Sequence, residues 1–370
     1  MTKTLNFLRK NAVLCIASAA ALVTCFFVPP SREYLSYFDI RTLVCLFITL
    51  AVVAGLRNIR FFTILAKRIV LLTGNLRGLA VALVCITFIG SMLIANDMAL
   101  ITFLPLGYFA LSVTRKERHM AYLFILQNIS ANLGGMLTPF GNPQNLYLYS
   151  AFRIPTGEFT QIMLPPFLLS VLLLISACFL LPAEKLEIGK EAIPKLNRPR
   201  AASLLFLFAL SIAVVFRLLP WSVGFAVITV MLFFLDREAL KAVDYPLLLT
   251  FVMFFIFSGN LSRISAVNRF FSSLLEKDTF LTAVLSCQCI SNVPTAILLS
   301  RFTENYRALL LGVNIGGTGT LIASLASLIT FREYRLLHPG DGKHYFVLFT
   351  LINLIFLFLL SCFARFFLLR

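Results

Sequence analysis

Two short polar stretches stand out in an otherwise apolar chain because their side chains are able to bind ions. An amide and a carboxylate are adjacent at Asn96 and Asp97, and a hydroxyl and an amide are adjacent at Ser291 and Asn292. Carboxylate and amide oxygens are ligands for hard cations, whereas hydroxyl and amide hydrogens can be donated to an anion. Both stretches are therefore candidate sites for a cation, an anion or both.

A second pattern, N-x-G-G-x-x-T, occurs at Asn132–Thr138 and again at Asn314–Thr320. Glycine weakens a helix and lets the backbone approach a ligand, and Pro139 and Pro143 after the first copy remove N–H donors. Carbonyls freed at a helix break can hold a cation, and the N-terminal end of a half-helix favours an anion. The pattern predicts two interrupted helices that bind ions.

The elements that position these residues are membrane-spanning helices. Of the 370 residues, 59% are hydrophobic and 13% are charged, which is about half the charge of a soluble domain. Apolar runs long enough for a tilted or buried membrane helix recur along the whole chain. The clearest are residues 13–29, 42–56, 159–181, 201–216, 223–235, 245–258 and 345–363. The sequence predicts an all-α polytopic membrane protein.

The formal charge of +16 comes from Lys and Arg in the short loops between these runs. Such loops set orientation by the positive-inside rule and meet anionic lipid headgroups. Membrane lipids are therefore expected partners, and nucleic acid is not, because no basic folded segment is present. Most of the eight cysteines lie inside apolar runs, as small hydrophobic residues do. We expect no disulfide framework, no transition metal and no cofactor.

The distribution of basic residues predicts the topology. Lys3, Arg9 and Lys10 indicate a cytoplasmic N-terminus, followed by a first helix that is retained and is not a cleaved signal peptide. Basic clusters at 57–77 and 115–118 belong to the same side, so the apolar segment between them must enter and leave the membrane on that side. This predicts a re-entrant hairpin at about 77–113. Its tip carries a carboxylate whose insertion costs about 2.5–3.5 kcal/mol, which favours a functional role.

The order of features indicates two homologous halves. In each half an Asp precedes an apolar run, an Asn-containing tip follows, and the N-x-G-G-x-x-T pattern comes last. We predict a first repeat at 1–182 and a second at 201–370, joined by a cytoplasmic linker at 183–200. The broken helices are expected at about 119–152 and 305–330, and the second hairpin at about 279–300. Counting the crossings makes the second hairpin open to the opposite side, so the repeats are inverted, as in secondary transporters.

The ordered set of motifs resembles the ion transporter superfamily, which includes citrate and dicarboxylate carriers, arsenite pumps and Na⁺/H⁺ antiporters of the NhaD type. The residues that carry the likeness are Asn96-Asp97, TPFGNPQN at 138–145, SNVP at 291–294, NIGG at 314–317 and SLASLI at 324–329. The closest likeness is to the short YbiR-like anion permeases. The resemblance implies a scaffold that forms a homodimer and a transport part that moves like an elevator. It also implies hairpin tips and broken helices that bind the substrate and Na⁺.

The resemblance carries roles to matching positions of this chain. The substrate-binding residues that it implies are Asn96, Asn132, Thr138, Ser291, Asn292, Asn314, Thr318 and Thr320. The coupling-ion residues that it implies are Asp97, Asn96, Gly134, Gly135, Asn142, Asn292, Gly316 and Gly317, with Na⁺ as the metal expected there. Three positions depart from the dicarboxylate branch, because Ala95, Asp97 and Val293 stand where that branch has hydroxyl side chains. A carboxylate at position 97 is suited to a cation or a proton.

The function that we expect is secondary active transport of a small anion, an organic carboxylate or an inorganic oxyanion, coupled to Na⁺ or H⁺. The alternatives within transport are a Na⁺/H⁺ antiporter and an arsenite-type efflux permease. A membrane-embedded enzyme such as an aspartyl protease needs a pair of carboxylates, and the sequence places one at depth. We expect no enzyme activity, and a multi-pass location in a bacterial-type inner (cell) membrane.

Overall fold

The computed structural model describes residues 11–186 and 196–369. The basic residues that predict a cytoplasmic N-terminus, and residues 187–195 of the expected linker, lie outside this described part. The elements up to the linker are α2 (Ala12–Phe27), η1 (Arg32–Tyr37), α3 (Ile40–Asn58), α4 (Phe61–Val70), α5 (Leu76–Ile94), α6 (Asn96–Val113), η2 (Glu117–His119), α7 (Met120–Gly134), η3 (Gly135–Leu137), α8 (Pro143–Ala151) and α9 (Thr156–Cys178).

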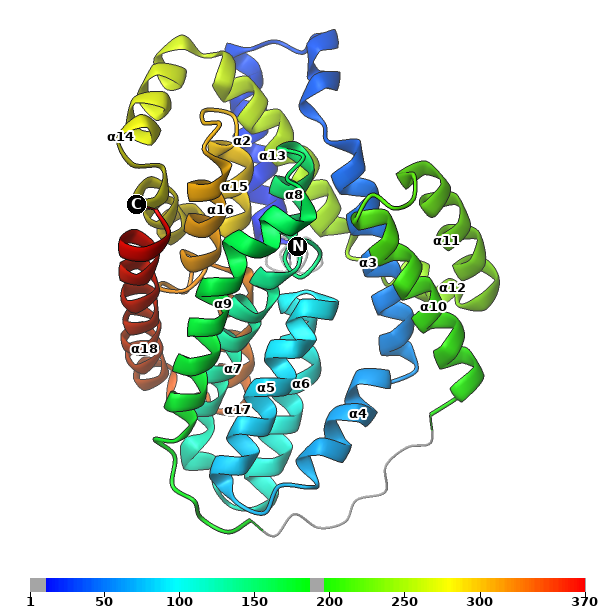
Figure 1. The fold of residues 1–370 in the computed structure, drawn as a ribbon, viewed down its shortest axis with the longest axis vertical. Helices are drawn as coiled ribbons and strands as arrows, with labels where there is room; N and C mark the ends of the chain where they lie inside the picture. The colour runs from blue at the N-terminus through cyan, green and yellow to red at the C-terminus, as the bar shows by residue number, and fades with distance from the viewer. Residues whose placement is uncertain (1–10, 187–195, 370) are drawn as a thin grey trace.

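The elements after the linker complete the fold in Figure 1. They are α10 (Arg198–Val215), α11 (Trp221–Leu235), α12 (Arg237–Lys241), α13 (Tyr245–Arg263), α14 (Ser265–Ile290), α15 (Asn292–Leu299), α16 (Tyr306–Ile315), α17 (Leu325–Leu337), α18 (Gly342–Phe363) and η4 (Ala364–Leu368). α14 bends at Asp278, where the backbone is extended (φ −160°, ψ 94°), so it consists of two helical parts.

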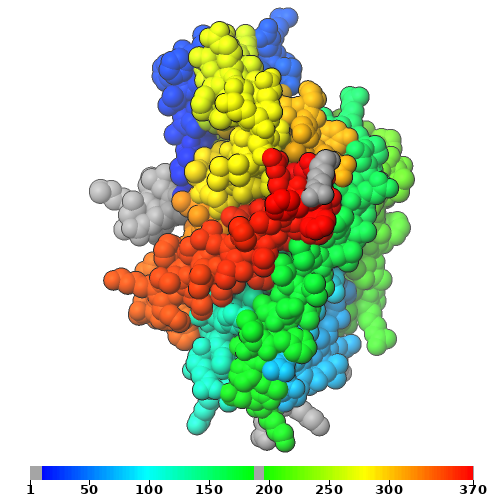
Figure 2. All heavy atoms as spheres, turned by 60° about the vertical axis from the view of Figure 1, so that its left-hand side comes forward, coloured from blue at the N-terminus to red at the C-terminus, as the bar shows by residue number. Residues whose placement is uncertain are grey.

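The described residues form an all-helical polytopic membrane protein, as predicted. Seven helices in this part of the chain are long and apolar enough to cross a bilayer: α3, α5, α6, α9, α10, α13 and the joined α18 and η4. Large apolar side chains remain exposed on outer helices, for example Val347 and Phe358 of α18, which are 65% and 67% exposed. Figure 2 shows α18 along one outer face, where lipid would cover such side chains.

The helices form two groups, and Figure 1 shows α3 and α10–α12 of the first group standing apart from the rest of the molecule. A flanking group consists of α2, α3 and α10–α13, in which α10, α11 and α12 pack on α3 and α2 packs on α13. A hairpin group consists of α5–α9 and α14–α18, in which α5 packs on both α6 and α7 and α14 packs on α15 and α16. α4 lies between them and contacts α3, α5 and α6.

Each tip pattern forms a tight turn between two helices. Ala95 alone separates α5 from α6 (φ 66°, ψ 154°), and Ser291 alone separates α14 from α15 (φ 74°, ψ 158°). This backbone conformation is close to one found essentially only for glycine, and it costs about 1–3 kcal/mol for another residue. At both tips the Asn that begins the following helix bonds the next backbone N–H, since Asn96 Oδ1 accepts from Asp97 N and Asn292 Oδ1 accepts from Val293 N, each at 2.9 Å.

Both N-x-G-G-x-x-T patterns end a helix. α7 stops at Gly134, a short 3-10 turn follows, and the chain is extended at Thr138 and Asn142 before α8 begins. α16 stops at Ile315, and the chain stays irregular until α17 begins at Leu325. These breaks leave backbone carbonyls without helical partners, which the site described below uses.

Candidate functional site

The first tip lies against the first helix break. Asn96 Nδ2 donates to Asn132 Oδ1 at 3.2 Å, and both side chains are buried. Asn142 lies on the other side of the break and donates from Nδ2 to the Asn132 carbonyl at 3.3 Å. A Cβ at Gly135 would lie 2.3 Å from Asn142 Oδ1, so this position needs glycine. Tip and break therefore form one buried amide cluster.

The second tip docks on the irregular segment after α16. Asn292 N and Ser291 Oγ both donate to the Ala323 carbonyl, at 3.0 and 3.3 Å. A Cβ at Gly317 would lie 3.0 Å from Asn292 Nδ2, so glycine lets the amide approach the backbone. The second glycine of each pattern thus lies beneath an amide side chain.

Gln288 supports this second break and was missed by the sequence reasoning. Its Nε2 donates to the Gly316 and Thr318 carbonyls at 2.8 and 3.1 Å, and its Oε1 accepts from Thr320 N at 2.9 Å. Thr320 Oγ1 in turn donates to the Gln288 carbonyl at 3.1 Å. The sequence feature that could have identified Gln288 is its position, since it is a polar residue about one helical turn before the tip in an apolar segment.

Asn145 connects the two breaks. Its Nδ2 lies 3.1, 3.2 and 3.4 Å from the carbonyls of Gly135, Met136 and Thr138, and its Oδ1 accepts from Asn314 Nδ2 at 2.6 Å. Asn314 Nδ2 also donates to the carbonyl of Leu310 at 2.8 Å. Asn145 therefore closes the first break and holds it against the second, so the buried amide cluster includes Asn145 and Asn314 and extends across both breaks.

The other expected site residues take part in local packing. Thr138 Oγ1 donates to the Met92 carbonyl at 2.9 Å and Thr318 Oγ1 to the Ile315 carbonyl at 2.6 Å. A Cβ at Gly134 would lie 2.3 Å from the Phe88 carbonyl of α5, and one at Gly316 would lie 3.0 Å from Cys287 Cβ of α14. The first glycine of each pattern therefore permits close helix packing, while the threonine hydroxyls keep lone pairs able to accept.

Several buried polar atoms near the breaks have no hydrogen-bond partner in the described part of the chain. They are the donor Asn132 Nδ2 and the acceptors Asn142 Oδ1, Gln144 Oε1 and Asn314 Oδ1. An unpaired buried polar group costs about 1–3 kcal/mol, a cost that a bound ligand would remove. The acceptor oxygens fit a hard cation such as Na⁺, and the amide donor fits an anion.

Asp97 has a different environment from the amides. Its Oδ1 is buried without a partner among the described residues, and the side chain lines a narrow cavity of about 30 Å³ together with Thr49 of α3 and Asp244, the N-cap of α13. Thr49 is 9% exposed, and its Oγ1 also has no partner among the described residues. A cavity of this size can hold about one water molecule or small cation. Sequence reasoning used Asp244 only as a marker of the repeat and missed Thr49.

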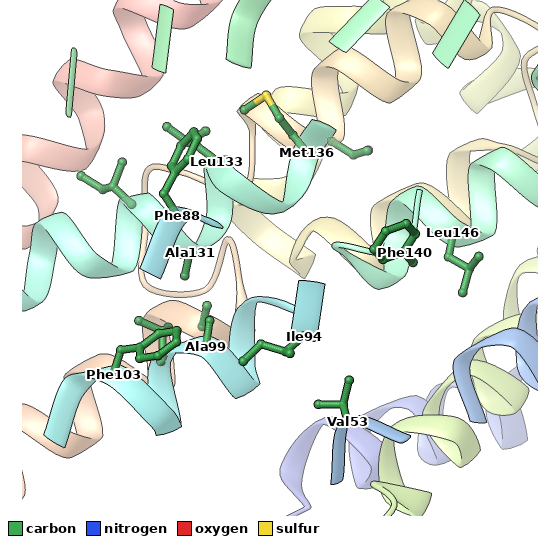
Figure 3. Close-up of a cluster of buried hydrophobic side chains, with 14 of the residues drawn as sticks. Val53, Phe88, Ile94, Ala99, Phe103, Ala131, Leu133, Met136, Phe140 and Leu146 are labelled. Atoms are coloured by element: carbon green, nitrogen blue, oxygen red, sulfur yellow. The ribbon is translucent and has the colours of Figure 1, made fainter. Parts of the chain in front are cut away.

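The walls of this cavity are otherwise mainly apolar. Figure 3 shows Ile94, Phe140, Leu146 and Val53 around the space beside the first tip, and all four line the cavity. None of the amides Asn96, Asn132 and Asn292 lines it. The structure therefore brings the amides of the two breaks together and turns Asp97 toward α3 and α13.

A sequence profile described as citrate transporter matches residues 4–307. The chain belongs to the citrate transporter family. Both tips and the first break lie inside the matched range, and the second break lies beyond it. The ion transporter resemblance read from the motifs is thereby confirmed.

Relatives that resemble this member of the citrate transporter family are mostly named as transporters. An uncharacterised transporter of Methanocaldococcus jannaschii is 32% identical over 293 residues, 79% of this chain and 80% of its own. The inner membrane protein YbiR of Escherichia coli is 30% identical over 318 residues, 83% of each chain. A silicon efflux transporter of Oryza sativa is 29% identical over 150 residues, 40% of this chain and 30% of its own. The family and these names indicate a membrane transporter and not an enzyme.

Proposed function

We propose that this protein is a secondary active transporter of a small anion, an organic carboxylate or an inorganic oxyanion, coupled to Na⁺ or H⁺. The observation that carries the proposal is the buried amide cluster, in which unpaired donor and acceptor atoms stand at two helix breaks. The family's description as citrate transporters supports an anionic solute. The name of the Escherichia coli relative supports a multi-pass location in an inner membrane, with the N-terminus in the cytoplasm.

The architecture that we propose is a pair of inverted repeats, each with a re-entrant hairpin and a broken helix. Two observations support the equivalence of the tips. Ala95 and Ser291 have nearly the same backbone conformation, and at each tip the following Asn side chain accepts from the next backbone N–H. The helix breaks at both N-x-G-G-x-x-T patterns support the equivalence of the broken helices. In this arrangement the binding place lies near the middle of the bilayer, where the repeats meet.

We assign the solute to the amides and hydroxyls at the tips and breaks. α6 and α15 both begin at a tip, and the positive end of a helix dipole favours an anion there. Asn132 Nδ2 supplies an unpaired donor, and Asn96, Asn292 and Ser291 complete the tips. Thr138, Asn314, Thr318 and Thr320 line the two breaks.

We assign the coupling ion to acceptor oxygens. Asn142 Oδ1 lies unpaired beside the first break, where Gly135 leaves room for it, and Gly317 leaves room for the Asn292 amide at the second break. Asp97, with Thr49 and Asp244 lining the same cavity, offers a carboxylate for Na⁺ or a proton. This cavity lies between the hairpin group and the flanking group, so loading it would bias any sliding of one group past the other.

The movement that we propose is an elevator, in which the hairpin group carries the solute past the flanking group. Such a flanking group commonly forms the contact between two copies in a homodimer, with lipid around the remaining surface. The packing of α10–α12 on α3 and of α2 on α13 supports this division, and Figure 1 shows α3 and α10–α12 apart from the hairpin group.

The test is gradient-driven uptake into proteoliposomes, with citrate, sulfate and arsenite offered in turn under a Na⁺ or a pH gradient. Asp97→Asn keeps the side-chain shape and removes the charge, so accumulation should fall to background while solute exchange persists. Glu276→Gln, an acidic side chain on α14 outside the site, is the matched control and should leave accumulation unchanged. Full gradient-driven accumulation by Asp97→Asn would remove this carboxylate from coupling.

The second candidate is cation exchange against protons, without an organic anion. The observation that favours it is the excess of acceptors, since three of the four unpaired amide atoms near the breaks are oxygens. A pH-sensitive dye inside the vesicles, with external Na⁺ or Li⁺ pulses and no added anion, separates the candidates. A dye response to cation pulses alone would support antiport.

A further inference from the structure

A second cavity, with several charged side chains in its wall, lies away from the amide cluster. It is open to the surface, has a volume of about 490 Å³, and is lined by residues from η1, α3 and α8 and by Arg301 after α15. Its charged side chains are Arg41, Arg153, Arg301 and Asp39. No residue assigned to the solute or to the coupling ion lines it.

The one carboxylate in this cavity, Asp39, offsets only one of the three arginine charges, which leaves a formal charge of +2. Both oxygens of Asp39 already accept from Thr42, from its N at 3.1 Å and its Oγ1 at 2.6 Å. No ion pair joins Arg41, Arg153 or Arg301 to an acidic side chain in residues 11–186 and 196–369. Guanidinium groups gathered in a concave site attract anions.

The contacts of Arg301 and of one further arginine, Arg217, show how crowded this end of the molecule is with guanidinium groups. Arg301 Nη2 donates to the Tyr37 carbonyl at 2.6 Å, and its buried Nε has no partner among the described residues. Burial lowers the pKa of Arg217, and the charges of Arg41 and Arg153 act in the same direction. A bound anion would relieve this repulsion and would pair the free guanidinium hydrogens.

The cavity is joined to the amide cluster by two short helices that pack on each other, α8 and α15. α8 carries Asn145 near its start and Tyr147 at the cavity, and α15 runs from the Asn292 tip to Ser300 and Arg301. Eight helical residues span about 12 Å. Tyr147 and Ser300, whose oxygens lie 2.8 Å apart, bond the two helices where they reach the cavity.

We propose that the cavity of Arg41, Arg153 and Arg301 is an anion-binding station that takes a carboxylate or phosphate-like oxyanion about one short helix away from the amide cluster. Its part in transport rests on the proposed function, whereas its binding of anions does not. A guanidinium presents parallel N–H groups that match two oxygens of such an anion. The same chemistry would recognise a free solute or a lipid headgroup phosphate.

The primary test is equilibrium citrate binding to the full chain in detergent, measured calorimetrically at constant ionic strength. Arg153→Gln is the main variant, because its exposed side chain has no hydrogen bond or ion pair in the described structure. We expect its citrate affinity to fall about threefold to tenfold, the range for one partly exposed charge-assisted contact. Arg301→Gln should act in the same direction, and Arg269→Gln on α14 is the matched control.

The outcomes separate this proposal from the transport proposal. Unchanged citrate affinity in both Arg153→Gln and Arg301→Gln, each verified as folded by size-exclusion chromatography, would overturn the station. If the variants bind citrate more weakly but neither they nor the unsubstituted chain takes up solute, the transport proposal is refuted and the anion-binding station is retained.

A second arm identifies the source of the anion. The chain in nanodiscs of phosphatidylcholine alone should bind citrate as it does in detergent. If added phosphatidylglycerol abolishes that binding, the cavity holds headgroups, and its place on a solute route is overturned. Citrate binding that persists with phosphatidylglycerol present supports a solute station.

Discussion

Replacing Asn145 should loosen the contact between the two helix breaks. Asn145→Ala removes a fully buried amide that donates to carbonyls of the first break and accepts from Asn314 of the second. Its two amide hydrogens serve three carbonyls, at 3.1–3.4 Å, so they count as about two bonds. With the bond from Asn314, about three bonds at about 1 kcal/mol each predict a loss of roughly 3 kcal/mol in the free energy of unfolding.

Only part of this loss in unfolding free energy comes from the hydrogen bond between Asn145 and Asn314, which joins the two breaks. Hydrogen bonds between membrane helices average about 0.6 kcal/mol and reach about 1.7 kcal/mol in double-mutant cycles. Asn314 Nδ2 keeps the Leu310 carbonyl when Asn145 is lost, which limits the penalty. We therefore expect a coupling free energy of about 1 kcal/mol between Asn145→Ala and Asn314→Ala.

The assay is reversible unfolding in mixed micelles of mild detergent and dodecyl sulfate, followed by circular dichroism. Asn353→Ala is the matched control, because Asn353 is as deeply buried but bonds only the Phe349 carbonyl of its own helix. That variant removes the unpaired Asn353 Oδ1 and should change stability by less than about 1 kcal/mol. Additive effects of the Asn145 and Asn314 substitutions, with no measurable coupling, would refute the contact between the breaks.

Three further predictions test the tips, the glycines and the flanking group. Gly317→Ala places a Cβ 3.0 Å from the second tip's amide and should lower the maximal uptake rate, whereas Gly157→Ala, with nothing within 4 Å, should not. Ala95→Gly removes the strain of φ 66° and should raise the free energy of unfolding by about 1 kcal/mol; a lower stability would contradict the tip geometry. Asp236→Ala removes the 2.9 Å ion pair with Arg200 together with the bonds from Asn58 Nδ2 and Ala239 N, and should cost about 2 kcal/mol in chemical unfolding, less than a fully buried pair because Arg200 is 38% exposed. A neutral effect there would show that these contacts together contribute nothing to the flanking group.

The sequence predicted where the helix breaks and tips lie in the chain, but it did not predict which side chains contact one another there. Helix-breaking glycines and prolines act locally, so N-x-G-G-x-x-T marked both breaks, and the Asn-containing tips marked the two turns. The position of a turn follows from a few neighbouring residues. The direction of a side chain depends on helices that are distant in the chain, and no local pattern reports it.

Asp97 illustrates that limit. The expectation that it would bind a cation or proton follows from its depth in an apolar segment, which composition reveals. Its neighbours Thr49 and Asp244 come from two other helices, and only the packing of α3, α6 and α13 places them around one cavity. Asn145 is similar, because its bond to Asn314 joins residues far apart in the chain.

The two tips share a backbone conformation but differ in side-chain chemistry, and in the proposed transporter this difference would give each tip its own ligand. After Asn96 the first tip has the carboxylate of Asp97, whereas after Asn292 the second tip has the methyl groups of Val293. At the turn itself, the first has Ala95 and the second has Ser291, whose hydroxyl bonds the Ala323 carbonyl. A site built from two equal halves would bind an anion and a cation alike at each tip. Under the proposed function, charge at one tip only would place the coupling carboxylate beside the flanking group, in the cavity with Thr49 and Asp244, and would leave the uncharged tip to the solute.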